Sequence, residues 1–299
     1  MTHKLDSDDF FIHQVQQRCA ERGLNFFLIE PLWVEAFYEK MQKGRIWPRV
    51  LLNMHSEHHQ PDDIYHRVVR LAFELKTQVI DPPDIALAAF DKARLHARLL
   101  GAGFTLPFTV IVPTPAISSF QLSPEDRAKL GSPFVIKPGL GYGKRGVLLD
   151  AQGEADLHRS WSTWPDQNYL LQRKITPRSM GGHPAYFRVF YAFGSVWFCW
   201  WNCYTDRYAT LETADLEKHA LHPLREIVCR LADLTQMQFF SSEIALTEAG
   251  EFVLIDYVND QCHMLTQSSN PQMGVPDHIV AGIARRLVEG AGRWLGQKT

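Results

Sequence analysis

Long apolar runs are missing from this sequence of 299 residues, and no stretch approaches the roughly 18 consecutive apolar residues of a membrane-spanning helix. An excess of one charge is missing too, because 31 Lys and Arg stand against 33 Asp and Glu, for a net charge of -2. Proteins that bind nucleic acid or membrane surfaces usually show a strong charge asymmetry. The sequence therefore predicts neither nucleic acid nor a membrane as a partner.

Paired cysteines are also lacking. The five cysteines are odd in number and scattered, without any Cys-x-x-Cys pair, which is typical of reduced thiols. The first residues are polar and acidic, unlike those of a signal peptide. Together these features predict a cytoplasmic protein. Its length allows two or three subdomains, and its oligomeric state is left open, with a homodimer as one option.

Strand and helix patterns alternate over the first part of the chain, which predicts a small parallel α/β layer. This layer opens with a helix, whereas such layers usually open with a strand. The expected helices lie at 8–22, 33–42 and 61–76, and the expected strands lie at 24–30, 47–53 and 79–80.

Histidines gather after the second expected strand, at His55, His58 and His59, with His66 beyond. Imidazole is the commonest transition-metal ligand, but no two of these residues have a helical zinc spacing followed by a third ligand. Three interpretations stay open: a polar loop, a metal site, and a site where imidazolium edges meet an acidic substrate.

A glycine-rich stretch from Pro133 to Gly146 carries the strongest chemical signal. A short apolar strand delivers Lys137 to the foot of a loop with four glycines and with Lys144 and Arg145 at its tip. Glycines let the backbone approach a ligand closely, and clustered N–H groups with positive charge stabilise phosphate oxygens. The lysine precedes the glycines, so this is not a Walker loop. The stretch predicts a strand–flap–strand hairpin over phosphates, with an ordinary glycine-rich hairpin as the alternative.

Two acidic residues occupy the arms of a second predicted hairpin. Glu243 and Asp256 flank a turn at Ala249-Gly250, so they can face each other in paired strands. A carboxylate in an apolar stretch is costly to bury without a partner, and Mg²⁺ takes oxygen ligands. Glu243, Asp256 and Asn259 are therefore the candidate ligands for Mg²⁺ or Mn²⁺. A strand-end aspartate that is hydrogen-bonded to a loop is the alternative for Asp256.

From about Asp91 to the C-terminus, the order of these parts resembles the ATP-grasp superfamily. No single motif is specific, but agreement in order and spacing is stronger than any one of them. The resemblance implies an α/β and α+β fold: two α+β subdomains, at 84–168 and 169–299, preceded by a Rossmann-like α/β domain at 1–83 that lacks its usual first strand. The motifs are Asp91-Lys92, Val135-Ile-Lys-Pro with the flap, Leu171-Gln-Arg-Lys-Ile, Arg188-Val-Phe and the acidic hairpin.

The resemblance also implies ATP and Mg²⁺ (or Mn²⁺) as cofactors, together with residue roles. Arg188 would lie near the transferred phosphate, with Lys144 and Arg145 of the flap as further catalytic candidates. A strand residue paired to an exposed carboxylate is the alternative for Arg188. The implied nucleotide-binding residues are Lys92 and Lys137 on the phosphates, Gly139, Gly141, Tyr142, Gly143 and Gly146 in the flap, and Gln172, Arg173, Lys174 and Ile175 along the adenine.

One departure from the family concerns the third metal ligand. The usual closing signature is Glu-x-Asn, whereas this chain has Asp256-Tyr-Val-Asn, which is one residue longer. A bulge after Asp256 would return Asn259 to the same strand face. Without it, Asp260 or Gln261 would take the place of Asn259.

The activity implied by the resemblance is that of an ADP-forming ligase. Such an enzyme joins a small-molecule carboxylate to an amine, on an amino acid or small peptide, through an acyl-phosphate. It needs no protein nucleophile, and the sequence shows no convincing Ser-His-Asp or Cys-His arrangement. Two alternatives are a small-molecule kinase similar to inositol-phosphate kinases and a non-catalytic ATP-binding protein.

Overall fold

The N-terminal layer is built on two short parallel strands. In the computed structural model, which describes residues 1–3, 8–55, 58 and 60–296, β1 (Val50–Leu52) pairs with β2 (Gln78–Ile80). Between them along the chain, Asp63 starts α3 (Ile64–Glu74) by accepting hydrogen bonds from two backbone N–H groups of its first turn. α2 (Val34–Gln42) packs beside α3 over a common apolar core.

The strand expected at 24–30 is wrong. Within the described residues, the only strand pairing of that segment is the bridge between Ile29 and Thr2. Thr2 bridges Ile29 on one side and Asn53 on the other, both in parallel. Residues 1–3 therefore occupy the place of the first strand that the sequence analysis did not find. In the part of the chain that the structure describes, they pair through isolated β-bridges and not through a continuous strand.

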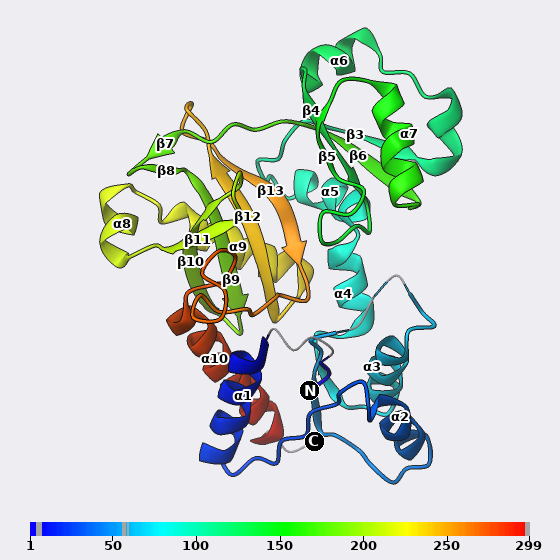
Figure 1. Cartoon of the computed structure of the whole chain (residues 1–299), viewed down its shortest axis with the longest axis vertical. Helices are drawn as coiled ribbons and strands as arrows, with labels where there is room; N and C mark the ends of the chain where they lie inside the picture. Colours follow the sequence, from blue (N-terminus) through cyan, green and yellow to red (C-terminus); the bar gives the residue numbers. More distant parts are fainter. Residues whose placement is uncertain (4–7, 56–57, 59, 297–299) are drawn as a thin grey trace.

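Above this layer in Figure 1 lies an antiparallel sheet in the order β3-β6-β4-β5. The predicted strand–flap–strand hairpin is confirmed, since β4 pairs with β5 on either side of the flap. β6 belongs to this sheet, so we place the boundary between the lobes after residue 173 rather than after 168. The elements are β3 (Thr109–Pro113), η2 (Thr114–Ser119), α6 (Pro124–Leu130), β4 (Phe134–Pro138), β5 (Leu148–Ala151), α7 (Glu154–Thr163) and β6 (Asn168–Arg173).

The second lobe is an antiparallel sheet in the order β11-β10-β9-β12-β13. The predicted acidic hairpin is confirmed, since β12 pairs with β13 in antiparallel fashion, and β9 and β10 form another hairpin. The elements are β7 (Ser179–Met180), β8 (His183–Pro184), β9 (Tyr186–Ala192), β10 (Ser195–Asn202), β11 (Arg207–Thr210), α8 (Thr213–Lys218), α9 (Pro223–Thr235), β12 (Phe239–Leu246) and β13 (Phe252–Asn259).

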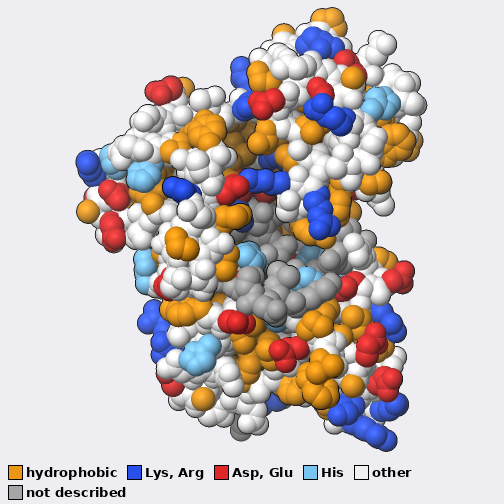
Figure 2. Space-filling view, viewed as in Figure 1, with side chains coloured by type: hydrophobic (Ala, Val, Ile, Leu, Met, Phe, Trp, Pro, Cys, Tyr) orange, Lys and Arg blue, Asp and Glu red, His pale blue; other side chains and the backbone are white. Residues whose placement is uncertain are grey.

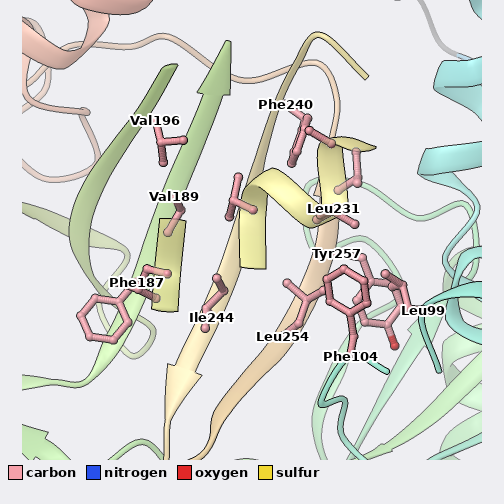
Figure 3. Close-up of a cluster of buried hydrophobic side chains, with 14 of the residues drawn as sticks. Leu99, Phe104, Phe187, Val189, Val196, Leu231, Phe240, Ile244, Leu254 and Tyr257 are labelled. Atoms are coloured by element: carbon pink, nitrogen blue, oxygen red, sulfur yellow. The ribbon is translucent and has the colours of Figure 1, made fainter. Parts of the chain in front are cut away.

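Two apolar cores cover the faces of this sheet. On one face, side chains of β9, β12 and β13 pack against α9 and the helices before the first lobe, as Figure 3 shows for Phe187, Ile244 and Leu231. On the other face, α1 (Asp9–Glu21) and α10 (Asp277–Gly296) pack together against β9 and β10. No helix within the described ranges has both the length and the apolar character needed to cross a bilayer.

A break between two consecutive helices at Asp91 positions the site. α4 (Pro83–Phe90) ends there, and α5 (Lys92–Gly101) begins. The Asp91 backbone is extended, with φ -69° and ψ 95°, and its side chain accepts a hydrogen bond from the backbone N–H of Arg94. The cap therefore places Lys92 in the first turn of α5, beside the flap and the acidic hairpin.

Candidate active site

Three charged side chains lie side by side across the second lobe. Glu243 of β12 is in register with Arg188 of β9 on one side and with Asp256 of β13 on the other. Directly opposed residues of antiparallel strands have Cβ atoms about 4.5–5.5 Å apart, and their side chains share a face. The structure thus brings both predicted carboxylates and the predicted arginine onto one surface of the sheet.

Arg188 and Glu243 form a largely buried ion pair. Nη1 of Arg188 donates to Oε1 of Glu243, and Nε of Arg188 donates to Ser241 at 3.0 Å. The hydroxyl of Tyr186 donates to Oε2 of Glu243 at 2.9 Å. Burial raises the pKa of Glu243, while the Arg188 guanidinium opposes that rise. Both Glu243 oxygens are therefore already engaged by the protein.

Sequence reasoning missed Tyr186 and Ser241. Each stands two residues before a predicted site residue on the same strand, Tyr186 before Arg188 and Ser241 before Glu243. Successive odd or even residues of a strand point to the same face. This two-residue period of a strand was the signal in the sequence that could have identified Tyr186 and Ser241.

Two lysines from the first lobe and its leading helix meet Asp256. Lys92 Nζ lies 4.0 Å from Asp256 Oδ1, and Lys137 Nζ donates to the carbonyl of Ile255 at 3.1 Å. Burial lowers the pKa of Lys137, and the neighbouring carboxylates oppose that change. Burial alone would raise the pKa of Asp256, but Lys92, Lys137 and Arg188 outweigh it and hold this pKa below its usual value. Asp256 is therefore an anion surrounded by cations.

Asp256 and Asn259 fit a divalent cation. Among the described side chains, Oδ1 of Asp256 and Nδ2 of Asn259 are buried and have no hydrogen-bond partner. The register between β12 and β13 contains a bulge after Asp256, the first of the two alternatives that the sequence leaves open, since Ser241 pairs with Asn259 and Glu243 with Asp256. The two ends of an Asn amide are interchangeable by a flip. With its oxygen turned inward, Asn259 adds a second hard ligand to Asp256, which is the set that Mg²⁺ prefers beside phosphates.

The other predicted ligands lie differently. Glu243 is held by Arg188 and Tyr186, and the side chain of Asp260 is directed to His58 at 2.7 Å. The described residues contain no group of three or more His, Cys, Asp or Glu side chains that could hold a metal ion. A metal here would therefore rest on one carboxylate, one amide and oxygens that a nucleotide brings.

The foot of the flap is tied to α5. The backbone N–H of Lys92 donates to the carbonyl of Gly139 at 3.0 Å, and its Nζ donates to the carbonyl of Gly141 at 2.9 Å. The N–H of Gly139 donates to the carbonyl of Asn168 on β6. Lys92 therefore connects the flap and the acidic hairpin through one side chain.

The tip of the flap reaches across to the second lobe. Lys144 Nζ contacts both carboxylate oxygens of Asp206, at 2.6 and 2.7 Å, in the turn between β10 and β11. The Arg145 guanidinium lies over the rings of Tyr142 and Trp164, at 5.3 and 5.6 Å. Neither predicted catalytic cation of the flap contacts the carboxylates of the site. Basic and acidic side chains also lie side by side at this boundary on the surface in Figure 2.

Gly146 closes the flap in a conformation that only glycine adopts without strain. Its φ is +69°, and a Cβ there would lie 2.6 Å from Trp164 Cβ and 2.9 Å from Pro138 Cγ. We expect Gly146→Ala to lower the free energy of unfolding by about 2–4 kcal/mol, from left-handed backbone strain plus overpacking. Urea denaturation would measure this loss. Gly143→Ala is the matched control, because Gly143 also has a positive φ of +57° but open space around it, so an equal loss in both would contradict the role of packing.

The predicted adenine-lining segment 172–175 continues from β6 towards the second lobe. The side chain of Gln172 is buried and donates to the hydroxyls of Tyr257 and Thr109 at 3.0 and 3.2 Å. Lys174 pairs with Asp150 of β5. The side chains of Arg173 and Lys174 are exposed, and Ile175 packs on the cluster of Tyr186, Trp201 and Ala245. The side chain of Gln172 is therefore engaged in the core between the lobes and not available for hydrogen bonds to an adenine.

The ATP-grasp fold consists of two antiparallel lobes. One lobe carries a glycine flap and a strand with a lysine, and the other carries a charged hairpin. The chain has this fold. Similar solved structures include the ATP-grasp ligase PsnB complexed with minimal precursor, Mg and ADP, at 14% identity and a TM-score of 0.62, over 99% of this chain and 98% of that chain. D-alanine–D-alanine ligase from Bacillus anthracis complexed with ATP is similar at 13% identity and a TM-score of 0.65, over 100% and 97%.

A third similar structure is the RimK domain protein ATP-grasp from Sphaerobacter thermophilus DSM 20745, at 17% identity and a TM-score of 0.61, over 94% of this chain and 95% of that chain. No family model matches the sequence, and no curated protein matches it. The predicted fold is confirmed, although the Rossmann-like character of the first layer is not.

Proposed function

We propose that this protein is an ATP-dependent, ADP-forming ligase that joins a carboxylate to an amine through an acyl-phosphate. One observation carries the proposal: three cations from three elements and two lobes surround the acidic hairpin. Lys92 Nζ lies 4.0 Å from Asp256, Lys137 donates to the carbonyl of the preceding residue, and Arg188 is paired with Glu243, which is in register with Asp256. A cationic set of this kind binds a triphosphate when a divalent ion joins the carboxylate. Full-length likeness to structures of ATP-grasp ligases supports the same class.

Each residue of the site has its own proposed role in phosphoryl transfer. Lys92 and Lys137 neutralise phosphate oxygens, and the flap covers them and excludes water. Asp256 and Asn259 would hold Mg²⁺, which when bound neutralises charge on the phosphates. Arg188, fixed by Glu243 and Ser241, faces the same surface, where it can stabilise charge on the transferred phosphoryl group while a carboxylate oxygen attacks in line.

The test is a product analysis. The protein is incubated with ATP, Mg²⁺ and mixtures of carboxylates and amines, starting with the standard amino acids. Release of ADP and phosphate that requires both substrates is the expected result. AMP and pyrophosphate would contradict the proposal. A stable phosphorylated product without free phosphate would establish a kinase instead, and tight ATP binding without turnover would establish a non-catalytic nucleotide-binding protein.

Removal of the Lys137 ammonium should weaken nucleotide binding. We expect Lys137→Ala to raise the Kd of a non-hydrolysable ATP analogue about 10- to 150-fold, because a charge-assisted hydrogen bond contributes roughly 1.5–3 kcal/mol. Isothermal titration calorimetry measures this change. Lys129→Ala is the control, since Lys129 pairs with Glu125 on the surface of α6. An unchanged Kd for the Lys137 variant would show that this lysine does not contact the phosphates.

A further inference from the structure

A buried histidine–aspartate pair lies beside the proposed phosphate site. Nε2 of His58, on the segment between β1 and α3, lies 2.7 Å from Oδ2 of Asp260, and the two side chains are 2% and 4% exposed. Asp260 directly follows Asn259, the candidate metal ligand at the end of β13. The pair therefore joins the N-terminal layer to the end of the acidic hairpin.

The second ring nitrogen of His58 is left without a partner by the described residues. Within the described part of the chain, Nδ1 of His58 is buried and makes no hydrogen bond. A carboxylate only accepts hydrogen bonds, so the neutral imidazole places its proton on Nε2, facing Asp260, and leaves a lone pair on Nδ1. A buried polar atom without a partner is unfavourable. An N–H or O–H donor from a ligand would satisfy it.

Phe90 lies close to both His58 and Lys92. The centroid of the Phe90 ring lies 5.0 Å from Lys92 Nζ and 5.7 Å from the centroid of the His58 ring. One aromatic side chain thus lies beside both the proposed phosphate lysine and the imidazole. His58 therefore belongs to the surroundings of the proposed phosphate site.

We propose that His58 is the general base for the attacking amine and that Asp260 is its positioning residue. This inference rests on the proposed ligase function. The amine nitrogen attacks the acyl carbon of the acyl-phosphate, the N–C bond forms, and the C–O bond to the phosphate breaks. The phosphate leaves with the electron pair of that bond, and the proton lost by the nitrogen passes to Nδ1 of His58. The burial of Nδ1 suits this step, because an acyl-phosphate must be kept from water.

A purely structural role is the competing explanation, since the same pair connects two parts of the fold. His58→Gln separates the two roles: the amide nitrogen of Gln can still donate to Asp260, but the side chain has no basic nitrogen. His3→Gln is the matched control. Nε2 of His3 also faces a buried aspartate, Asp8, at 3.3 Å, yet neither ring nitrogen of His3 is among the buried atoms without a partner.

The experiment compares two nucleophiles on the same acyl-phosphate. Both nucleophiles lose a proton when the N–C bond forms, but hydroxylamine is weakly basic and is mostly the free base near neutral pH, so it attacks without help from a base. An amino acid amine is mostly protonated there and needs a base to become nucleophilic. We expect His58→Gln to lower amide formation about 100-fold or more while hydroxamate formation stays at the wild-type rate. We expect Asp260→Asn to lower amide formation less, and His3→Gln to change neither rate. Equal loss of amide and hydroxamate in His58→Gln, or unchanged amide formation, would overturn the proposal.

A second measurement needs no substrate. Nitrogen NMR of protein labelled on histidine reports the tautomer of His58, assigned by the signal that is lost in His58→Gln. The expected state carries the proton on Nε2. A proton on Nδ1 would overturn the inference even if the ligase activity is found. If the wild type forms neither hydroxamate nor ADP with any carboxylate tested, the proposed function fails, and the general-base role fails with it whatever the tautomer.

Discussion

Asp256→Asn should reduce Mg²⁺-dependent turnover about 100-fold or more, because a bound metal supplies several kcal/mol of charge stabilisation and its one anionic ligand is removed. The amide keeps the shape of the carboxylate but not its charge. Lys92, Lys137 and Arg188 would then face each other without the anion that now lies among them. ADP release measured against Mg²⁺ concentration, together with the electron paramagnetic resonance of Mn²⁺ bound with an ATP analogue, tests this result.

Glu248→Gln is the control for that variant. Glu248 lies in the turn of the same β12–β13 hairpin but is exposed, so its loss should change neither turnover nor Mn²⁺ binding. Wild-type Mn²⁺ binding in Asp256→Asn would show that another residue holds the metal. Glu243 would then be the first residue to reconsider.

Arg188→Met should destabilise the fold by about 3–5 kcal/mol, because it leaves Glu243 buried without its counter-charge. The guanidinium and carboxylate side chains are only 15% and 12% exposed, so solvent screens their interaction little. Methionine fills most of the volume of the arginine side chain. The loss of stability therefore reports the missing charge rather than a cavity. Chemical denaturation of the purified variant measures it.

The loss in Arg188→Met should depend on pH in one direction. Burial already raises the pKa of Glu243, and removal of Arg188 takes away the largest opposing influence. A group whose pKa is higher in the folded state binds more protons there, so the stability falls as pH rises. The deficit against wild type should be small near pH 4 and grow above the ordinary glutamate pKa of about 4.3.

The double variant Arg188→Met with Glu243→Gln separates charge from packing. The glutamine oxygen can still accept from Tyr186, and no buried charge remains. We expect the double variant to recover most of the stability that the single variant loses. If both lose the same amount at neutral pH, the uncompensated carboxylate is not the cause.

Local signals in the sequence were enough to predict much of the fold and the pairing of Glu243 with Asp256. Strand periodicity and turn residues are local signals, and a hairpin brings its two arms together without help from the rest of the chain. The bulge before Asn259 was one of two alternatives that the sequence offered, because the three-residue signature Glu-x-Asn has one residue more in this chain, and the register of the strands decided between them. The prediction of a strand at 24–30 was wrong. A strand needs a pairing partner from another part of the chain, and among the described residues only Thr2 pairs with this segment, at Ile29.

The sequence by itself predicted which charged residues to consider, since Lys92, Lys137, Arg188 and Asp256 each lie in a motif that resembles one of the ATP-grasp superfamily. Only the tertiary structure decided their partners: Glu243 is held by Arg188 and Tyr186, Lys144 is held by Asp206, and Asp260 is held by His58 from 202 residues away. The physical reason is that hydrogen bonds and ion pairs depend on distances of a few ångströms. Such distances between remote segments arise only when packed sheets and helices fix them together.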